Sequence, residues 1–136
     1  MNLDRALSVS AAGMSTQSAR LRIVAENLAN RDSTGFSPDT DPYRRRTITF
    51  TQQLDRRAGV HVPVARRVGT DPGEFPRRHD PSHPAADANG YVRLPNVTSL
   101  IELSDMREAQ RSYNANLAVM ETTRTMLMRA IEALRQ

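Results

Sequence analysis

Two apolar seams at opposite ends of the chain constrain the fold more than any other feature of this sequence. Within residues 1–30, apolar side chains recur in alternating steps of four and three, which is the spacing of one face of a helix. The same steps recur from Ser99 toward the C-terminus. Because rows of Leu and Met facing water are unfavourable, each seam needs a partner, and the two can pair as an antiparallel hairpin.

We call these rows the N-terminal and the C-terminal seam, and we expect them to act together as an assembly seam. Their apolar members are Leu3, Leu7, Met14, Leu21, Val24, Leu28, Leu103, Met106, Tyr113, Leu117, Met120, Leu127, Ile131 and Leu134. Polar residues interrupt the rows at Ser10, Gln17, Gln110 and Arg124. At Gln17, Gln110 and Arg124 the polar residue either fixes the register of pairing or marks a stretch that turns toward solvent. Tyr113 serves either as core filler or as an interface anchor.

One helix pair would leave apolar flanks uncovered. These flanks are Val9, Ile23, Val119, Met126 and Met128. Further copies of the chain could bury them, whereas an ordinary helical hairpin or bundle would cover itself. Periodicity alone leaves both arrangements open.

Signals at the helix ends agree with the seams. Asn2 can cap the first helix, and Asn30 offers a left-handed stop at its end. In the second helix, Ser99 and Glu102 match a capping box, in which each satisfies a free amide of the first turn.

The middle of the chain changes character, because Pro, Gly, Asp and Arg punctuate short strand patterns there. Strands are predicted around 48–54 and 60–64, where Pro63 indicates an edge strand. Residues 69–83 read as an extended loop. Asn89-Gly90 predicts a turn before a further strand.

The expected fold is therefore α+β and has three parts. Residues 1–30 and 96–136 are long helices that pair as a coiled-coil-like hairpin. Residues 31–95 form a small β-rich insert between them.

Composition excludes much chemistry. All 19 basic residues are Arg and there is no Cys, so the chain has no Schiff-base or P-loop Lys, no thiolate nucleophile and no Cys metal site. Nucleophile, base and orienting group do not occur together, so we expect no enzyme, no cofactor and no small-molecule substrate. His79, Asp80 and His83 lie among prolines that hold no tetrahedral geometry, so no metal is expected.

The net charge of +4 comes with Arg doublets and one Arg triplet. These arginines indicate either a solvated or inter-subunit face, or a small Arg-rich nucleic-acid-binding module. No aromatic RNA-binding platform accompanies them, so no nucleic-acid partner is expected.

The segment NLANRDSTGF, residues 27–36, resembles the signature of the flagellar rod and hook proteins. DPYRRRTITF, HPAADANGYVRLPNV and RSYNAN resemble further blocks of that family and narrow the match to its short proximal-rod members. The residues that carry the family motif are Asn27, Leu28, Ala29, Asn30, Gly35, Phe36, Asn89, Gly90, Tyr91, Pro95 and Asn96. Asn27 and Asn30 either cap the helix or contact partners, and Gly35 and Gly90 are expected to serve turns.

This resemblance implies a structural subunit of the flagellar basal body that polymerises into the hollow, torque-transmitting proximal rod. Implied partners are other copies of the chain, rod proteins of the FlgB, FlgF and FliE types, and the flagellar type III export apparatus. The implied location is the rod in the periplasmic space, reached without a cleaved signal peptide. The N-terminal sequence has no leader-like apolar run, and no stretch is long enough to span a membrane.

Phe50 and Leu54 form an aromatic-x3-aliphatic pattern that resembles an export-gate element of rod and hook substrates. A strand whose Phe50 and Leu54 face the core of the insert would give the same pattern.

Overall fold

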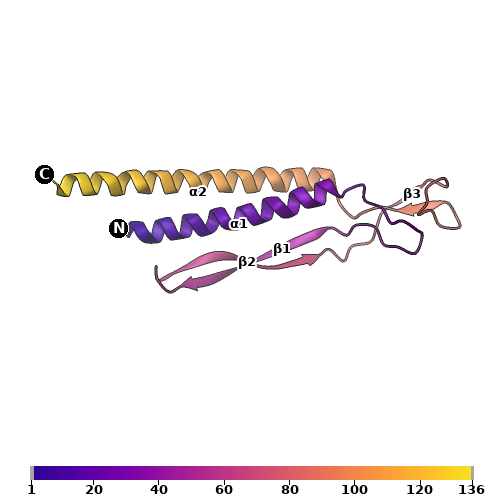
Figure 1. Ribbon diagram of the computed structural model, residues 1–136, viewed down its shortest axis with the longest axis horizontal. Helices are drawn as coiled ribbons and strands as arrows, with labels where there is room; N and C mark the ends of the chain where they lie inside the picture. The colour runs from indigo at the N-terminus through magenta and orange to yellow at the C-terminus, as the bar shows by residue number, and fades with distance from the viewer. Residues whose placement is uncertain (1, 136) are drawn as a thin grey trace. The chain divides into compact units, whose positions relative to one another are not determined.

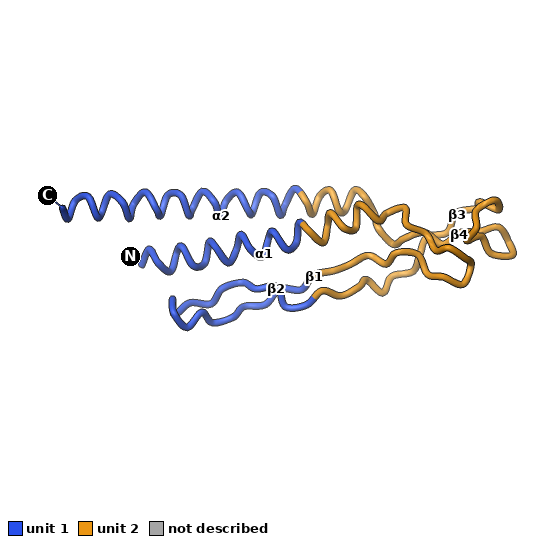
Figure 2. The backbone as a smooth tube through the Cα atoms, viewed as in Figure 1, with its two compact units in different colours: residues 1–21, 49–67, 107–136 blue, residues 22–48, 68–106 orange. Residues whose placement is uncertain are grey.

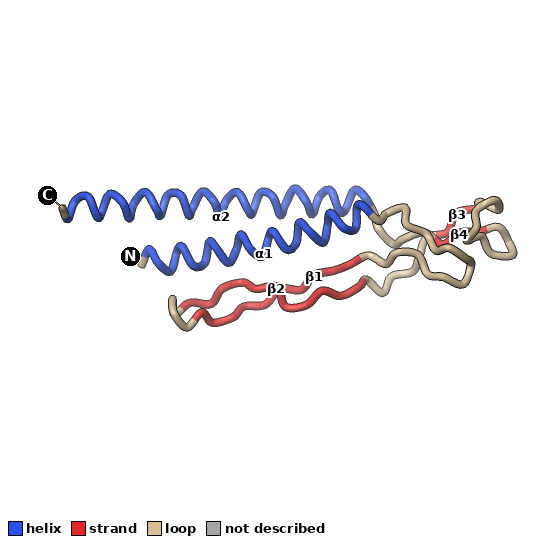
Figure 3. The backbone as a smooth tube through the Cα atoms, in the orientation of Figure 1, coloured by secondary structure: helices blue, strands red, loops and turns tan. Residues whose placement is uncertain are grey.

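A computed structural model describes residues 2–135 of the chain. It contains, in order, α1 (Leu3–Ala29), β1 (Arg46–Asp55), β2 (Val60–Thr70), β3 (Arg77–His79), β4 (Tyr91–Arg93) and α2 (Ser99–Leu134). The two long helices occupy the chain ends, and every described strand lies between them in sequence (Figures 1 and 3). The predicted α+β class with two long helices is therefore confirmed.

Side chains at both ends of α1 satisfy free backbone groups. Asn2 accepts the amide of Arg5 at 3.4 Å and thereby caps the first turn, as predicted. At the other end, Asn30 donates from Nδ2 to the carbonyl of Glu26 at 2.9 Å. Asn30 therefore caps the last turn through its side chain, and the prediction of a left-handed stop is wrong because its φ is not positive.

The start of α2 differs from the predicted capping box. The carbonyl of Thr98 accepts the amides of Ile101 and Glu102 at 3.0 and 3.1 Å. The side chain of Glu102 is fully buried and accepts hydrogen bonds from Asn27 and Arg45 rather than from the first turn. The capping-box interpretation is wrong because the half-buried guanidinium of Arg45 competes for this carboxylate.

Strands β1 and β2 form a two-stranded hairpin closed by a turn at residues 56–59. Asp55 organises this turn by accepting the amides of Arg57 and Ala58 on its carboxylate and that of Gly59 on its carbonyl. Gly59 has a φ of 64°, which glycine adopts at no steric cost. The two predicted strands of this region are confirmed.

Strands β3 and β4 form a second, antiparallel pair, with Arg78 opposite Val92. The prediction of a continuous loop over residues 69–83 is wrong at residues 69–70, which end β2, and at β3. The three residues of β3 are polar and exposed, so no alternation of apolar side chains marks the strand. Gly90, with a φ of 81°, confirms the turn predicted before β4.

The chain divides into two compact units (Figure 2). Unit 1 comprises residues up to 21, 49–67 and from 107 onward, and unit 2 comprises residues 22–48 and 68–106. Few apolar side chains of the described residues are buried in either unit. They are Ile23, Val24, Ala85, Val92 and Ala109.

Within unit 1, α1 lies close to α2 and to the hairpin. A Cβ atom at Gly13 would stand 2.8 Å from Oδ1 of Asn116, so glycine permits the helices to approach here. Thr16 donates to the carbonyl of Pro63 at 3.1 Å, and Arg5 donates to that of Ala58 at 2.9 Å. The hairpin therefore covers part of the face of α1 that α2 leaves open.

Among the described residues, neither helix is apolar enough over a sufficient length to cross a membrane.

Candidate functional site

The N-terminal seam faces inward along its whole length. Val24 is buried, and the other apolar members of this seam are half-buried. The polar position Ser10 is also buried, at 3% exposure, and Oε1 of Gln17 is buried without a hydrogen-bond partner. At Gln17 the alternative in which the seam turns toward solvent is therefore wrong.

The C-terminal seam behaves differently along α2. Met106, Tyr113, Leu117, Met120 and Leu127 are half-buried. The polar positions Gln110 and Arg124 are exposed, so here the seam does turn toward solvent. The most deeply buried side chains of α2 are Glu102, Ala109 and Thr123, which the apolar pattern did not single out.

Two groups of large apolar side chains on α2 remain exposed. The first, which we call the α2 start patch, comprises Leu100, Ile101 and Leu103, exposed at 77%, 53% and 47%. The second, which we call the α2 end patch, comprises Val119, Met126, Met128, Ile131 and Leu134. Of the flanks predicted to be uncovered, Val9, Val119, Met126 and Met128 are exposed, whereas Ile23 is buried.

The α2 end patch has a simple geometric origin. Within unit 1, α2 extends past the N-terminus of α1, as its yellow end shows in Figure 1. The seam continues into this extension with Ile131 and Leu134, where no described element of unit 1 covers it. Exposed apolar rows of this kind mark interaction sites.

A buried polar cluster in unit 2 joins the end of α1, the start of β1 and the start of α2. Asn27, at 1% exposure, is its centre and makes four hydrogen bonds through its side chain. Its Nδ2 donates to the carbonyl of Arg46 and to Glu102, and its Oδ1 accepts from the amide of Arg46 and the hydroxyl of Tyr43. Asn27 therefore caps no carbonyl of α1, and that interpretation is wrong.

The charged pair of the cluster is Arg45 and Glu102. Nε of Arg45 donates to Oε1 of Glu102 at 2.5 Å, and Asp71 and Asp105 lie within 3.7 and 3.6 Å of the same guanidinium. Burial lowers the pKa of Arg45, but the hydrogen bond and charge of Glu102, with the two aspartates, raise it above its ordinary value overall. The guanidinium of Arg45 therefore keeps its charge, and its contact with Glu102 fixes the start of β1 against α2.

Tyr43 and Asn96 complete this cluster. Burial raises the pKa of the Tyr43 hydroxyl, and the carboxylates of Glu26 and Glu102 add to the effect against the opposing charge of Arg46. The hydroxyl therefore keeps its proton and donates to Asn27. Asn96 accepts the amide of Arg45 at 2.7 Å.

The remaining motif residues take no part in the hydrogen bonds described for the cluster. Leu28 and Asn30 are half-buried, Ala29 is exposed, and Pro95 is buried.

Asn89 and Gly90 lie in the turn before β4, and Tyr91 packs edge-on against His79 with ring centroids 5.0 Å apart. Gly35 is buried, and a Cβ at this position would collide with the carbonyl of Thr40. Glycine therefore permits a close approach of the backbone here, and its φ is not positive. Phe36 is 92% exposed.

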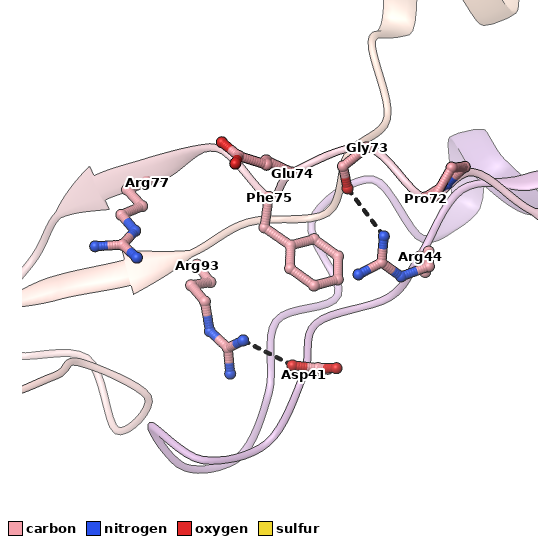
Figure 4. Close-up of a pocket in the computed structure, with 8 residues that line it drawn as sticks. All are labelled: Asp41, Arg44, Pro72, Gly73, Glu74, Phe75, Arg77 and Arg93. Atoms are coloured by element: carbon pink, nitrogen blue, oxygen red, sulfur yellow. Dashed lines mark hydrogen bonds and ion pairs between the residues drawn. The ribbon is translucent and has the colours of Figure 1, made fainter.

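A polar pocket of about 450 Å³ lies in unit 2 beside the cluster (Figure 4). The guanidinium of Arg44 stacks over the ring of Phe75 at 4.2 Å and donates to the carbonyl of Gly73. Arg93 donates to Asp41 at 2.7 Å across the pocket. These contacts hold the segment before β3, which the sequence predicts only as an extended loop, against residues 41–44.

Phe50 and Leu54 lie on β1 with 36% and 49% of their surface exposed. Neither side chain is in a core, so the structure gives no support to the packing interpretation of this pair.

The residues considered for metal binding have other contacts. His79 stacks on Tyr91, and His83 lies 3.3 Å from the hydroxyl of Thr34. Over residues 2–135, no group of three or more His, Asp or Glu side chains could hold a metal ion.

Comparisons with known proteins agree with the sequence resemblance. A family model described as "Flagella basal body rod protein" matches residues 7–36, and one described as "Flagellar basal body rod FlgEFG protein C-terminal" matches residues 88–133. The chain is 49% identical to the flagellar basal-body rod protein FlgC of Agrobacterium fabrum, over 98% of the chain and 96% of that relative.

Two more distant relatives carry the same name. The FlgC proteins of Aquifex aeolicus and Salmonella typhimurium are 41% and 35% identical to the chain. The matches cover 98% and 96% of this chain and 98% and 97% of those relatives. None of these similarities supports the nucleic-acid-binding alternative.

Proposed function

The chain belongs to the FlgC family of flagellar basal-body rod proteins, and from this premise we propose that it polymerises with itself and with neighbouring rod proteins into the hollow shaft of the proximal rod. It is a structural subunit of the flagellar basal-body rod and not an enzyme. The neighbours we propose are rod proteins of the FlgB, FlgF and FliE types. The site of assembly we propose is the periplasmic space.

The exposure of the α2 end patch carries the proposal of self-assembly. Five large apolar residues between Val119 and Leu134 are exposed at 43% or more in the isolated chain. Taking one such side chain from full exposure to full burial contributes about 1.5–3 kcal/mol, so subunits that cover the remaining exposed part of these side chains gain a share of this energy by associating. The α2 start patch offers a second surface of the same kind at the other end of the helix.

We propose that α1 and α2 pair in a coiled-coil-like manner and together form the inner layer of the shaft. The close approach at Gly13 and Asn116 and the inward orientation of the N-terminal seam support this pairing. Residues 1–30 and 96–136 would then be the rod core, and residues 31–95 the outer layer. Helices packed along a tube resist twisting, which suits a shaft that transmits torque.

Charged residues in the α2 end patch should block assembly without unfolding the chain. The double substitution Ile131→Asp and Leu134→Asp places carboxylates at positions exposed at 47% and 87%, so the fold should tolerate them. We expect secretion near the wild-type level but at least about a tenfold loss of the chain from purified basal bodies, because a buried unpaired charge is strongly unfavourable at an interface.

The matched control is Thr125→Asp, which adds a carboxylate at an exposed position of the same helix outside the patch. It should leave basal bodies and motility intact. Motile cells with normal basal bodies in the double variant would contradict the proposed role of the patch.

We further propose that the chain is exported through the flagellar type III apparatus and that Phe50 and Leu54 are read by its export gate. Their exposure on β1 supports this, because a recognition element must be accessible. Phe50→Ala should reduce secretion by roughly tenfold, as expected for an aromatic anchor, whereas the exposed neighbour Gln52→Ala should not. Equal secretion of the two variants, measured in culture supernatants, would rule out the gate role.

A further inference from the structure

Phe36 is the most exposed large apolar residue of the described chain, at 92%. It nevertheless lies on a well-ordered loop. Ser37 and Thr40 are joined by a hydroxyl contact of 2.8 Å and an amide-to-carbonyl bond of 3.1 Å, and the amide of Tyr43 donates to Ser33 at 2.9 Å. Hydrogen bonds therefore hold this loop, and the loop presents the aromatic ring of Phe36 to water, which is typical of an interface anchor.

A mainly apolar hollow that could accept an aromatic side chain lies on α2. It has a volume of about 250 Å³ and is lined by Ala118, Val119, Thr122 and Thr123. Thr123 donates its hydroxyl to the carbonyl of Val119 at 2.8 Å, so that polar group is already satisfied. The lining is mainly apolar, and the hollow is smaller than the pockets that hold drug-sized ligands, so it suits one side chain.

The charges around the ring and around the hollow are complementary. Asp39 is exposed on the loop that carries Phe36. Arg111 lies seven residues before Ala118, and Arg129 lies seven residues after Thr122; residues seven apart share a helix face. Both arginines are exposed, and neither they nor Asp39 make an ion pair within the described chain.

We propose that Phe36 of one copy inserts into the Ala118–Thr123 hollow of a second copy, with Asp39 facing Arg111 or Arg129. This contact joins two different surfaces, so each copy can donate a ring to one neighbour and accept a ring from another. Such heterologous contacts repeat along an assembly. The inference rests on the proposed self-assembly and adds the residues through which two copies meet.

The absence of cysteine from the chain permits a direct test. In a strain that depends on the double variant Phe36→Cys and Thr122→Cys, a short bismaleimide applied to purified basal bodies should produce dimers and larger multiples of the chain. The control pair, Phe36→Cys with Arg124→Cys, places the second thiol on another face of α2 and should give no multiples. Cross-links from Thr122→Cys to a different rod protein, or none in assembled basal bodies, would overturn the inference.

Charge reversal tests the same contact with Phe36 in place. Asp39→Arg should reduce the amount of chain in basal bodies about tenfold, and Arg111→Asp with Arg129→Asp in the same chain should restore it. A defect that is not restored, or no defect, would contradict the contact. If the unaltered chain never entered basal bodies, the proposed function itself would fail, whereas normal incorporation without the Phe36 cross-link would overturn only this inference.

Discussion

Glu102→Ala is expected to lower the free energy of unfolding of the free chain by about 3 kcal/mol, because it leaves buried partners without their acceptor. Nε of Arg45 and Nδ2 of Asn27 both donate to this carboxylate, which is fully buried. Breaking a buried ion pair from one side typically costs about 3–5 kcal/mol. We expect the lower end of this range, because Arg45 is 22% exposed and retains Asp71 and Asp105 nearby.

Urea unfolding followed by circular dichroism measures this loss, and Glu108→Ala is its matched control. Glu108 lies on the same helix and pairs with Arg20 at 3.4 Å, but its side chain is 66% exposed. A surface pair of this kind contributes about 0–1 kcal/mol, so the control should change the urea midpoint little. Equal losses in the two variants would show that the buried cluster does not hold the fold.

The buried polar cluster lies where both helices meet the insert, so we expect its stability to matter for the rod. It ties the last turn of α1, the first residue of β1 and the first turn of α2 into one joint. We expect a subunit with a loosened joint to fold yet to transmit load poorly between its helices and its insert. The motif residues Asn27 and Asn96 belong to this joint, so part of the family motif is explained by internal structure.

The two helices could be predicted from the sequence because their signal is local and repeated. Each seam sums many apolar positions at helical spacing, and Asn2 marks the first boundary. The strands β1 and β2 could also be predicted, since period-2 alternation marks both of them. Strand β3 could not be predicted from the sequence, because its residues Arg77-Arg78-His79 are all polar and exposed and show no alternation. Its strand conformation depends on pairing with β4, which the sequence alone does not reveal.

The polar cluster escaped prediction for a different reason. Glu102 occupies a buried position of α2, where the apolar pattern favours Leu103, which is exposed at 47%. Its partner Arg45 lies 57 residues away in sequence and looks like part of a solvated Arg triplet. Only the three-dimensional pairing distinguishes these two charges from surface charges. The available signal was Glu102 itself, which the capping-box pattern assigned to the wrong role.

We propose that the apolar surface at the end of α2, which is exposed in the free subunit, is covered in the rod. Hydrogen exchange of residues 128–134, compared between the free chain and purified basal bodies, tests it most directly. In the free chain this extension past α1 should exchange nearly as fast as an unfolded peptide, because few contacts oppose its opening. In basal bodies we predict exchange at least about 100-fold slower, while the segment around the buried Ala109 changes far less. Equal exchange of residues 128–134 in both states would contradict the claim.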